Sequence, residues 1–329
     1  MLHDRIVTHD DFDGITSAAL VGYYMEIENF AFAGPNDMIH NRISTSAFDI
    51  VCDLPYPLQC GMWFDHHGAN FEDLELRGFD QGEIPGLRKI APSCAGVIVD
   101  HFSEEFEVDE EVEAIVAAAD KIDSFAYESI EDWRADTPAA RIDWAIKVRE
   151  GSFSERRKFL RWLCLSLMDQ SLEDVASSDE VTYRADSFRA EEDNMLRLIE
   201  KEMGFLPGSG EEIILLNFSE HKRKARVVKN LAQIMAPEAM AVLEVSPMFQ
   251  HKLRTNDLSF SMSLNLAGQR HYADFDIGEI MRTLDIGSGH PGAASGVVKS
   301  GSRADMEKNR AKTLERIAEL WEGQKKENE

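Results

Sequence analysis

The sequence predicts an α/β protein with two domains, the first of them built on a parallel sheet. The chain has 329 residues, more than one domain usually needs, and 43% of them are hydrophobic, which is enough for two cores. Residues 1–150 alternate strand-like and helix-like stretches, as βαβ units do. Residues 151–210 look largely helical, and the alternation returns over residues 211–322. We therefore expect a parallel-sheet N-terminal domain and a smaller C-terminal α/β domain, joined by a helical linker.

The elements of the first domain follow from apolar runs and capping residues. Short apolar runs predict three strands: Arg5–Thr8, Phe48–Cys52 and Met62–Phe64. Gly14 would let the chain turn from the first strand into a helix. N-cap residues and helical spacing of apolar positions predict the helices: Ile15–Met25, a helix opening after Ser93, and Glu110–Ile122 capped by Asp109.

The second domain is predicted from the same signals. Strands are expected at Ile213–Phe218, Met240–Val245 and Phe260–Leu266. Helices are expected between and after them, at Ala225–Met235 and Ile277–Leu284, and an amphipathic helix at about residues 305–321 ends the domain. A glycine-rich stretch, Gly287–Gly296, is expected to be a loop before that last helix.

Metal-type ligands follow each strand predicted for the first domain. They form three sets: His9, Asp11 and Asp13; Asp53; and Asp65, His66 and His67. Ligands of open α/β sheets bind beyond the carboxyl ends of the strands, so the three sets point to one crevice. Alternation along an extended chain would put the first set on one face and turn Asp10 away. A capping loop with a surface histidine could explain the first set alone, but not three sets in order.

The order of these motifs resembles the DHH phosphoesterase superfamily, which includes RecJ exonucleases, nanoRNases, cyclic-dinucleotide phosphodiesterases and exopolyphosphatases. Two later segments fit the resemblance, which covers roughly residues 5–300. Ala117–Asp120 matches the fourth motif with its metal-binding aspartate, Asp120. Gly287–Gly296 resembles the Gly-Gly-Gly-His signature of the DHH-associated C-terminal domain, with Ser288 in place of the middle glycine.

The resemblance implies two divalent ions, Mn²⁺ in the first place and otherwise Mg²⁺ or Co²⁺. It assigns His9 and Asp11 to one ion, Asp13, His66 and Asp120 to the other, and Asp53 as a bridge. The implied catalytic residues are Asp65, which would orient His66, and His67, which would contact the phosphate or the leaving oxygen. The implied substrate-binding residues are Gly287, Gly289, His290 and Arg270. Arg270 is included among the substrate-binding residues because the segment after Ser261 lacks the arginine that such proteins often carry there.

Composition limits the partners of the protein. The net charge is −25, from 35 basic and 60 acidic residues, which argues against long duplex nucleic acid. The one basic cluster, His221–Arg226, could hold substrate phosphates or could be a solvated turn, and both interpretations stay open. No signal peptide, C-x-x-C pair or long apolar stretch is visible, so we expect a cytoplasmic protein without a membrane partner. The chain could pair as a homodimer.

We therefore expect a metal-dependent phosphohydrolase acting on short nucleotides. Oligoribonucleotides, 3′-phosphoadenosine phosphate and dinucleotides are the expected substrates. Two alternatives remain, an exopolyphosphatase-type phosphoanhydride hydrolase and a non-catalytic nucleotide-binding protein. The clustered carboxylates argue against the latter, because each of them costs stability unless a cation neutralises it.

Overall fold

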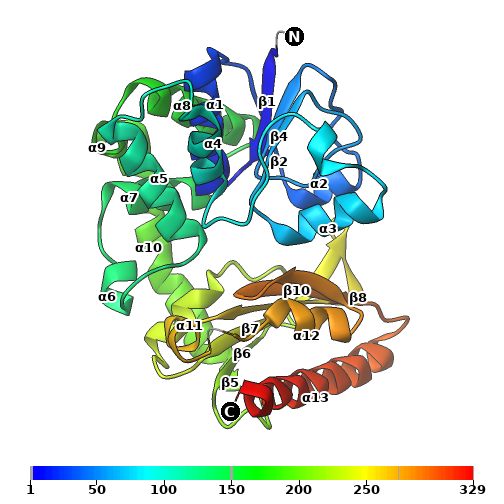
Figure 1. The fold of residues 1–329 in the computed structure, drawn as a ribbon. Coiled ribbons are helices and arrows are strands. Elements are labelled where there is room, and N and C mark those ends of the chain that lie inside the picture. Colours follow the sequence, from blue (N-terminus) through cyan, green and yellow to red (C-terminus); the bar gives the residue numbers. More distant parts are fainter. Residues whose placement is uncertain (1–2, 149–150, 273, 329) are drawn as a thin grey trace. The chain divides into compact units, whose positions relative to one another are not determined.

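The computed structural model describes residues 3–148, 151–272 and 274–328 and confirms the α/β class (Figure 1). The chain divides into two compact units, unit 1 up to Ala190 and unit 2 from Glu191 onward. This boundary lies inside helix α10 (Asp179–Glu202). The preceding helices α8 (Phe153–Asp169) and α9 (Leu172–Ser177), expected as part of a linker, contribute side chains to the core of unit 1.

Unit 1 is built on a parallel sheet, as the sequence predicts, with a fourth strand, β2 (Phe30–Ala33), that was not predicted. Its strands are β1 (Arg5–His9), β2 (Phe30–Ala33), β3 (Asp49–Cys52) and β4 (Met62–Phe64), in the order β2-β1-β3-β4. The register pairs Thr8 with Cys52 and Cys52 with Phe64. The carboxyl ends of β1, β3 and β4 therefore lie side by side, and the residues that follow them start from one edge of the sheet.

Helices cover both faces of this sheet, because alternate strand residues are apolar on each side. Ile6, Ile50 and Phe64 belong to one core cluster, with α1 (Phe12–Met25), α4 (Cys94–Phe102), α5 (Glu110–Asp123) and α8. Val7, Val51 and Trp63 belong to a second cluster on the opposite face, with α2 (Pro35–Ile39) and α3 (Gly68–Leu76). The shorter elements are η1 (Gln81–Glu83), α6 (Ile130–Trp133) and α7 (Pro138–Lys147).

Unit 2 is built on a six-stranded mixed sheet. Its strands are β5 (Met203–Phe205), β6 (Ile213–Asn217), β7 (Ala241–Gln250), β8 (Leu253–Leu264), β9 (Gly287–His290) and β10 (Ala293–Val298), in the order β5-β6-β7-β8-β10-β9. The helices are α11 (Leu266–His271), α12 (Ile277–Thr283) and α13 (Arg303–Asn328), whose Trp321 is fully buried in the core. Among the described residues, no helix has both the length and the apolar character to cross a membrane.

Two expectations for unit 2 were wrong. Residues 225–235 form an extended stretch and a 3₁₀ helix, η2 (Lys229–Ile234), in place of an α-helix. The β-branched pair Val227 and Val228 disfavours helix, and Lys229 is held by a hydrogen bond to Ser261 of β8. The glycine-rich stretch is a hairpin of β9 and β10. Its two strands approach so closely that a Cβ atom on Gly287 would lie 2.0 Å from the Ser295 carbonyl oxygen, which is why glycine is needed there.

Candidate metal centre

Imidazole and carboxylate groups gather at the carboxyl ends of β1, β3 and β4. They form three groups whose ligand atoms lie within 4.8 Å of one another: His9, Asp11 and Asp53; Asp53, His66 and His67; and Asp13, His66 and Asp123. Because Asp53 and His66 each belong to two groups, the three groups form one continuous cluster. Most of the ligands that the sequence predicts are thus brought together, and Asp123 is added to them.

The first group is built where β1 runs into α1. His9 Nδ1 lies 2.6 Å from Asp11 Oδ2 and 3.5 Å from Asp53 Oδ2. Burial lowers the pKa of His9, but the carboxylates of Asp11 and Asp53 outweigh it and raise that pKa to about 12. Asp11 also caps α1, since its Oδ1 accepts a hydrogen bond from the Gly14 amide at 3.0 Å.

The capping by Asp11 changes how Asp13 reaches the cluster. The helix begins at Phe12, so Asp13 lies in its first turn and not on an extended chain as expected. Gly14 is needed there for a close approach, because a Cβ atom on it would lie 2.4 Å from the carbonyl oxygen of His9. The tight passage from β1 to α1 turns the buried Asp13 carboxylate toward His66, whose Nε2 lies 3.6 Å away.

Backbone amides hold Asp13 in this position. Its carboxylate accepts hydrogen bonds from the amides of Cys94 at 2.7 Å and Ala95 at 3.0 Å, in the first turn of α4. Burial and the nearby carboxylates of Asp53 and Asp123 raise the pKa of Asp13. The helix terminus thus orients the carboxylate without supplying a full positive charge.

Asp53 is the residue that joins the groups. It follows β3 with a φ of 54°, in the left-handed region that non-glycine residues rarely adopt. Its side chain is buried, and its Oδ1 has no hydrogen-bond partner among the described residues. Although burial opposes its charge, the imidazoles of His66 and His9 hold the pKa of Asp53 below its usual range.

The ring of His66 is oriented by a backbone carbonyl. Its Nδ1 lies 3.0 Å from the oxygen of Ala91, which can only accept, so Nδ1 is the donor. In the neutral ring the Nε2 lone pair then faces Asp13, Asp53 and Asp123 at 3.5–3.6 Å. Nε2 is buried, and it has no hydrogen-bond partner within the described part of the chain.

These two orphaned atoms indicate what the cluster can hold. Buried polar atoms are rarely left without a partner. His66 Nε2 and Asp53 Oδ1 lie 3.5 Å apart without a hydrogen bond between them, and when His66 is neutral neither atom can donate to the other. A divalent cation would satisfy both of them, since imidazole nitrogen and carboxylate oxygen are its usual ligands. The residues of the cluster therefore fit a divalent metal.

The fourth motif enters the cluster through Asp123 and not through the expected Asp120. Asp123 Oδ2 lies 3.5 Å from His66 Nε2, and burial together with the Asp53 and Asp11 charges raises the pKa of Asp123 to about 7. Asp120 lies outside the three groups, and its Oδ1 accepts a hydrogen bond from Ser93 Oγ at 2.5 Å. The two aspartates are three positions apart, so both lie on one side of α5, and it is the one at the helix end that lies near His66.

Asp65 also has a different partner from the expected one. Its Oδ1 lies 2.9 Å from His67 Nδ1 and accepts the His66 amide at 2.9 Å, while Asn70 Nδ2 donates to Oδ2 at 2.6 Å. Asp65 therefore orients the ring of His67. The ring of His66, which Asp65 was expected to orient, is held by the Ala91 carbonyl instead. The side chain of His67 is 37% exposed, so it remains accessible from solvent.

The predicted substrate-binding residues all belong to unit 2. Gly287, Gly289 and His290 lie on β9, the edge strand of the mixed sheet, and Arg270 lies in α11. His290 and Arg270 are exposed. The metal-type ligands belong to unit 1, so a joint role of the two sets stays a prediction.

Similarity to known proteins was found in structure and not in sequence. No family model and no curated protein matches the chain. PggH from Vibrio cholerae, a pGpG-specific phosphodiesterase, has a TM-score of 0.68 at 20% identity, over 95% of this chain and 98% of its own. The DHH domain of a protein assigned to a family of ribosomal proteins has a TM-score of 0.60 at 13% identity, over 97% and 86%.

The chain shares its fold with PggH and with this DHH domain. RecJ from Thermus thermophilus, solved in complex with Mn²⁺, has a TM-score of 0.51 at 16% identity, over 97% of this chain and 52% of RecJ. At such low identities the structural similarity establishes the fold and nothing about the activity. The chemistry has to be argued from the side chains of the metal-type cluster.

Proposed function

We propose that this protein is a metal-dependent phosphohydrolase that cleaves phosphoester bonds of short nucleotides. The observation that carries the proposal is the cluster at the strand ends, with Asp53 and His66 each shared by two ligand groups. Support comes from the fold, which is also that of PggH, a pGpG-specific phosphodiesterase. Each residue of the cluster has a local reason for its position, so the arrangement is specified by the fold.

The groups suggest two neighbouring divalent ions, with Mn²⁺ as the first candidate because a similar fold was solved with it. His9, Asp11 and Asp53 would hold one ion, and Asp13, His66 and Asp123 the other, with Asp53 as the bridge. Such ions supply an activated water and absorb charge that develops on the phosphoryl group. His67, fixed by Asp65 and open to solvent, would hydrogen-bond the phosphate or protonate the leaving oxygen.

The charge of the chain favours a short substrate. With a net charge of −25, the protein repels a long polyanion, whereas a dinucleotide brings few phosphates that the metal ions can neutralise. A dinucleotide such as pGpG is therefore the first candidate. Oligoribonucleotides and 3′-phosphoadenosine phosphate follow, and an exopolyphosphatase activity is the second candidate function.

A substrate panel tests the proposal. The purified chain with Mn²⁺ is incubated with pGpG, a short oligoribonucleotide, 3′-phosphoadenosine phosphate and short-chain polyphosphate, and the products are separated by chromatography. We expect the fastest turnover on one of the nucleotide substrates. Faster release of phosphate from polyphosphate would transfer the assignment to the second candidate. Binding of nucleotides without turnover of any substrate would favour a non-catalytic binding protein.

A further inference from the structure

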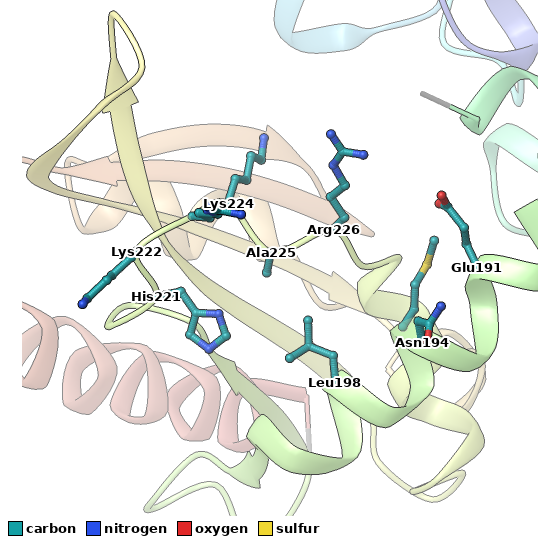
Figure 2. Close-up of a pocket in the computed structure, with 10 residues that line it drawn as sticks. Glu191, Asn194, Leu198, His221, Lys222, Lys224, Ala225 and Arg226 are labelled. Carbon is teal, nitrogen blue, oxygen red and sulfur yellow. The ribbon is translucent and has the colours of Figure 1, made fainter. Parts of the chain in front are cut away.

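Unit 2 contains a pocket of about 560 Å³ that the metal centre does not use (Figure 2). One wall is the extended segment of residues 221–226, here called the basic arm, and the other wall is the adjacent part of α10. The volume is in the range of small-molecule sites. Both walls belong to unit 2, so the pocket is complete within that unit.

The basic arm carries positive charges that nothing in the described chain neutralises. Lys222, Arg223, Lys224 and Arg226 are exposed, and none of their side chains makes a hydrogen bond or ion pair within the described residues. This is unusual in a chain with 60 acidic and only 35 basic residues. Four adjacent cations repel one another, so their arrangement favours an anionic ligand.

The start of the arm is fixed to the body of unit 2. His221 Nε2 lies 3.1 Å from a Glu202 carboxylate oxygen, and the His221 ring packs edge-on against Phe218 with centroids 5.2 Å apart. The His221 amide also donates to the Phe218 carbonyl at 2.8 Å. The arm is thus anchored at its first residue, which limits the conformational entropy that ligand binding would cost.

The wall opposite the arm carries two apolar side chains beside Glu191 and Asn194. Met195 and Leu198 of α10 line it, and Met195 is only 8% exposed. Figure 2 shows Lys224 and Arg226 extending to the same side of the arm, while Lys222 points away from them. Glu191 also lines the pocket, so an anionic group is favoured on the side of the arm. The pocket therefore offers cations on one side and an apolar surface on the other.

We propose that this pocket binds a short nucleotide and that it does so without metal. Lys224 and Arg226 hold its phosphates through charge-assisted hydrogen bonds, and its base packs on the partly exposed Leu198. A small ligand fits better than a nucleic acid strand, because the volume is limited and the rest of the chain is strongly acidic. Binding here is separate from hydrolysis at the cluster in unit 1.

The test is binding of a 5′-phosphorylated RNA dinucleotide to the full-length chain in chelator, measured by titration calorimetry. Lys224→Glu/Arg226→Glu should weaken binding at least about tenfold, the loss expected when two charge-assisted contacts are removed. Lys308→Glu/Lys312→Glu changes two exposed lysines outside the pocket by the same total charge. This control should stay within about twofold of wild type if long-range charge is screened.

A second comparison separates the base from the phosphates. Leu198→Ser should weaken binding of the dinucleotide and leave binding of inorganic pyrophosphate unchanged. Equal affinity of wild type and the Lys224→Glu/Arg226→Glu variant would overturn the proposal, as would binding that requires Mn²⁺ and is lost in Asp53→Asn. Pyrophosphate binding as tight as the dinucleotide, with no effect of Leu198→Ser, would overturn the assignment to a nucleotide. Because the titrations in chelator contain no metal, a failure to bind there would leave the proposed hydrolysis standing.

Discussion

Asp53 and Asp10 have opposite environments although both follow a strand of the same sheet. The Asp53 carboxylate is buried between His9 and His66, whereas Asp10 Oδ2 lies 2.9 Å from an Arg156 guanidinium nitrogen and its side chain is 43% exposed. We expect Asp53→Asn to lower kcat at least about a thousandfold, because loss of a bridging ligand removes several kcal/mol of metal-based stabilisation. Asp10→Asn should keep most of the activity. Similar losses in both variants, measured at saturating Mn²⁺, would show that the assignment of Asp53 is wrong.

Asp123 and Asp120 form a second matched pair of residues. Asp123 faces His66, while Asp120 accepts a hydrogen bond from Ser93, which an asparagine oxygen can also accept. Asp123→Asn should therefore lower both metal content after dialysis and kcat by at least about tenfold, a typical cost of losing one metal ligand interaction. Asp120→Asn should change metal content little. The opposite ranking in elemental analysis would return the metal-binding role to Asp120.

The residues whose contacts differ from those expected are the ones whose partners depend on the path of a loop or helix. The Asp-His-His triplet predicted the ligands, but the choice between His66 and His67 as partner of Asp65 is decided by the Ala91 carbonyl, which is distant in sequence. Likewise Asp120 and Asp123 are only three positions apart, in the last turn of α5. Which of the two lies near His66 depends on where that helix ends.

At the scale of elements, local patterns predicted the parallel strands well. An apolar run followed by a polar ligand marked β1, β3 and β4, because buried parallel strands need apolar residues on both faces. The β9–β10 hairpin was missed, since glycine and proline are ordinary loop residues and weak in strands. Its glycines are required by the close approach of the paired strand, which local sequence does not reveal.

Lys229 couples the mixed sheet of unit 2 to pH. Its ammonium donates to Ser261 Oγ at 2.6 Å, and burial lowers its pKa to about 8 although the Glu244 carboxylate opposes that shift. Between this value and its ordinary pKa of 10.5, the unfolded chain binds more protons than the folded one. The free energy of unfolding should therefore increase as pH rises through this window, so that the folded state becomes more stable.

Lys229→Met removes the titrating group and should flatten that part of the pH profile. Urea unfolding at several pH values across the window, for wild type and variant, would measure the difference. Parallel profiles for the two proteins would mean that Lys229 titrates normally in the folded state.

At the scale of the whole molecule, the chain joins two units through one helix. The boundary between Ala190 and Glu191 lies within α10, where the sequence continues with helical periodicity. Periodicity therefore indicates the helix but not the point at which its contacts change from one core to the other. The α/β class and the parallel sheet could be predicted from the alternating elements, whereas this boundary depends on tertiary packing.

Removal of metal should destabilise the folded chain. The cluster brings together the carboxylates of Asp11, Asp13, Asp53 and Asp123, whose mutual repulsion a divalent ion relieves. An ion that binds only the folded state stabilises it by mass action, by about 2.7 kcal/mol at a hundredfold excess over Kd. We expect chelator to lower Tm and added Mn²⁺ to restore it. An identical Tm with and without chelator would argue against a preformed metal site.

The most direct measurement of the central claim is turnover of a 5′-phosphorylated RNA dinucleotide by chelated protein, before and after stepwise addition of Mn²⁺. The account predicts no cleavage without the ion, and activity that rises until about two ions are bound per chain, the number expected for a two-metal hydrolase. Asp53→Asn, which lacks the shared carboxylate, should stay inactive throughout the titration. Cleavage by the fully chelated wild type, or full activity of Asp53→Asn, would contradict the account.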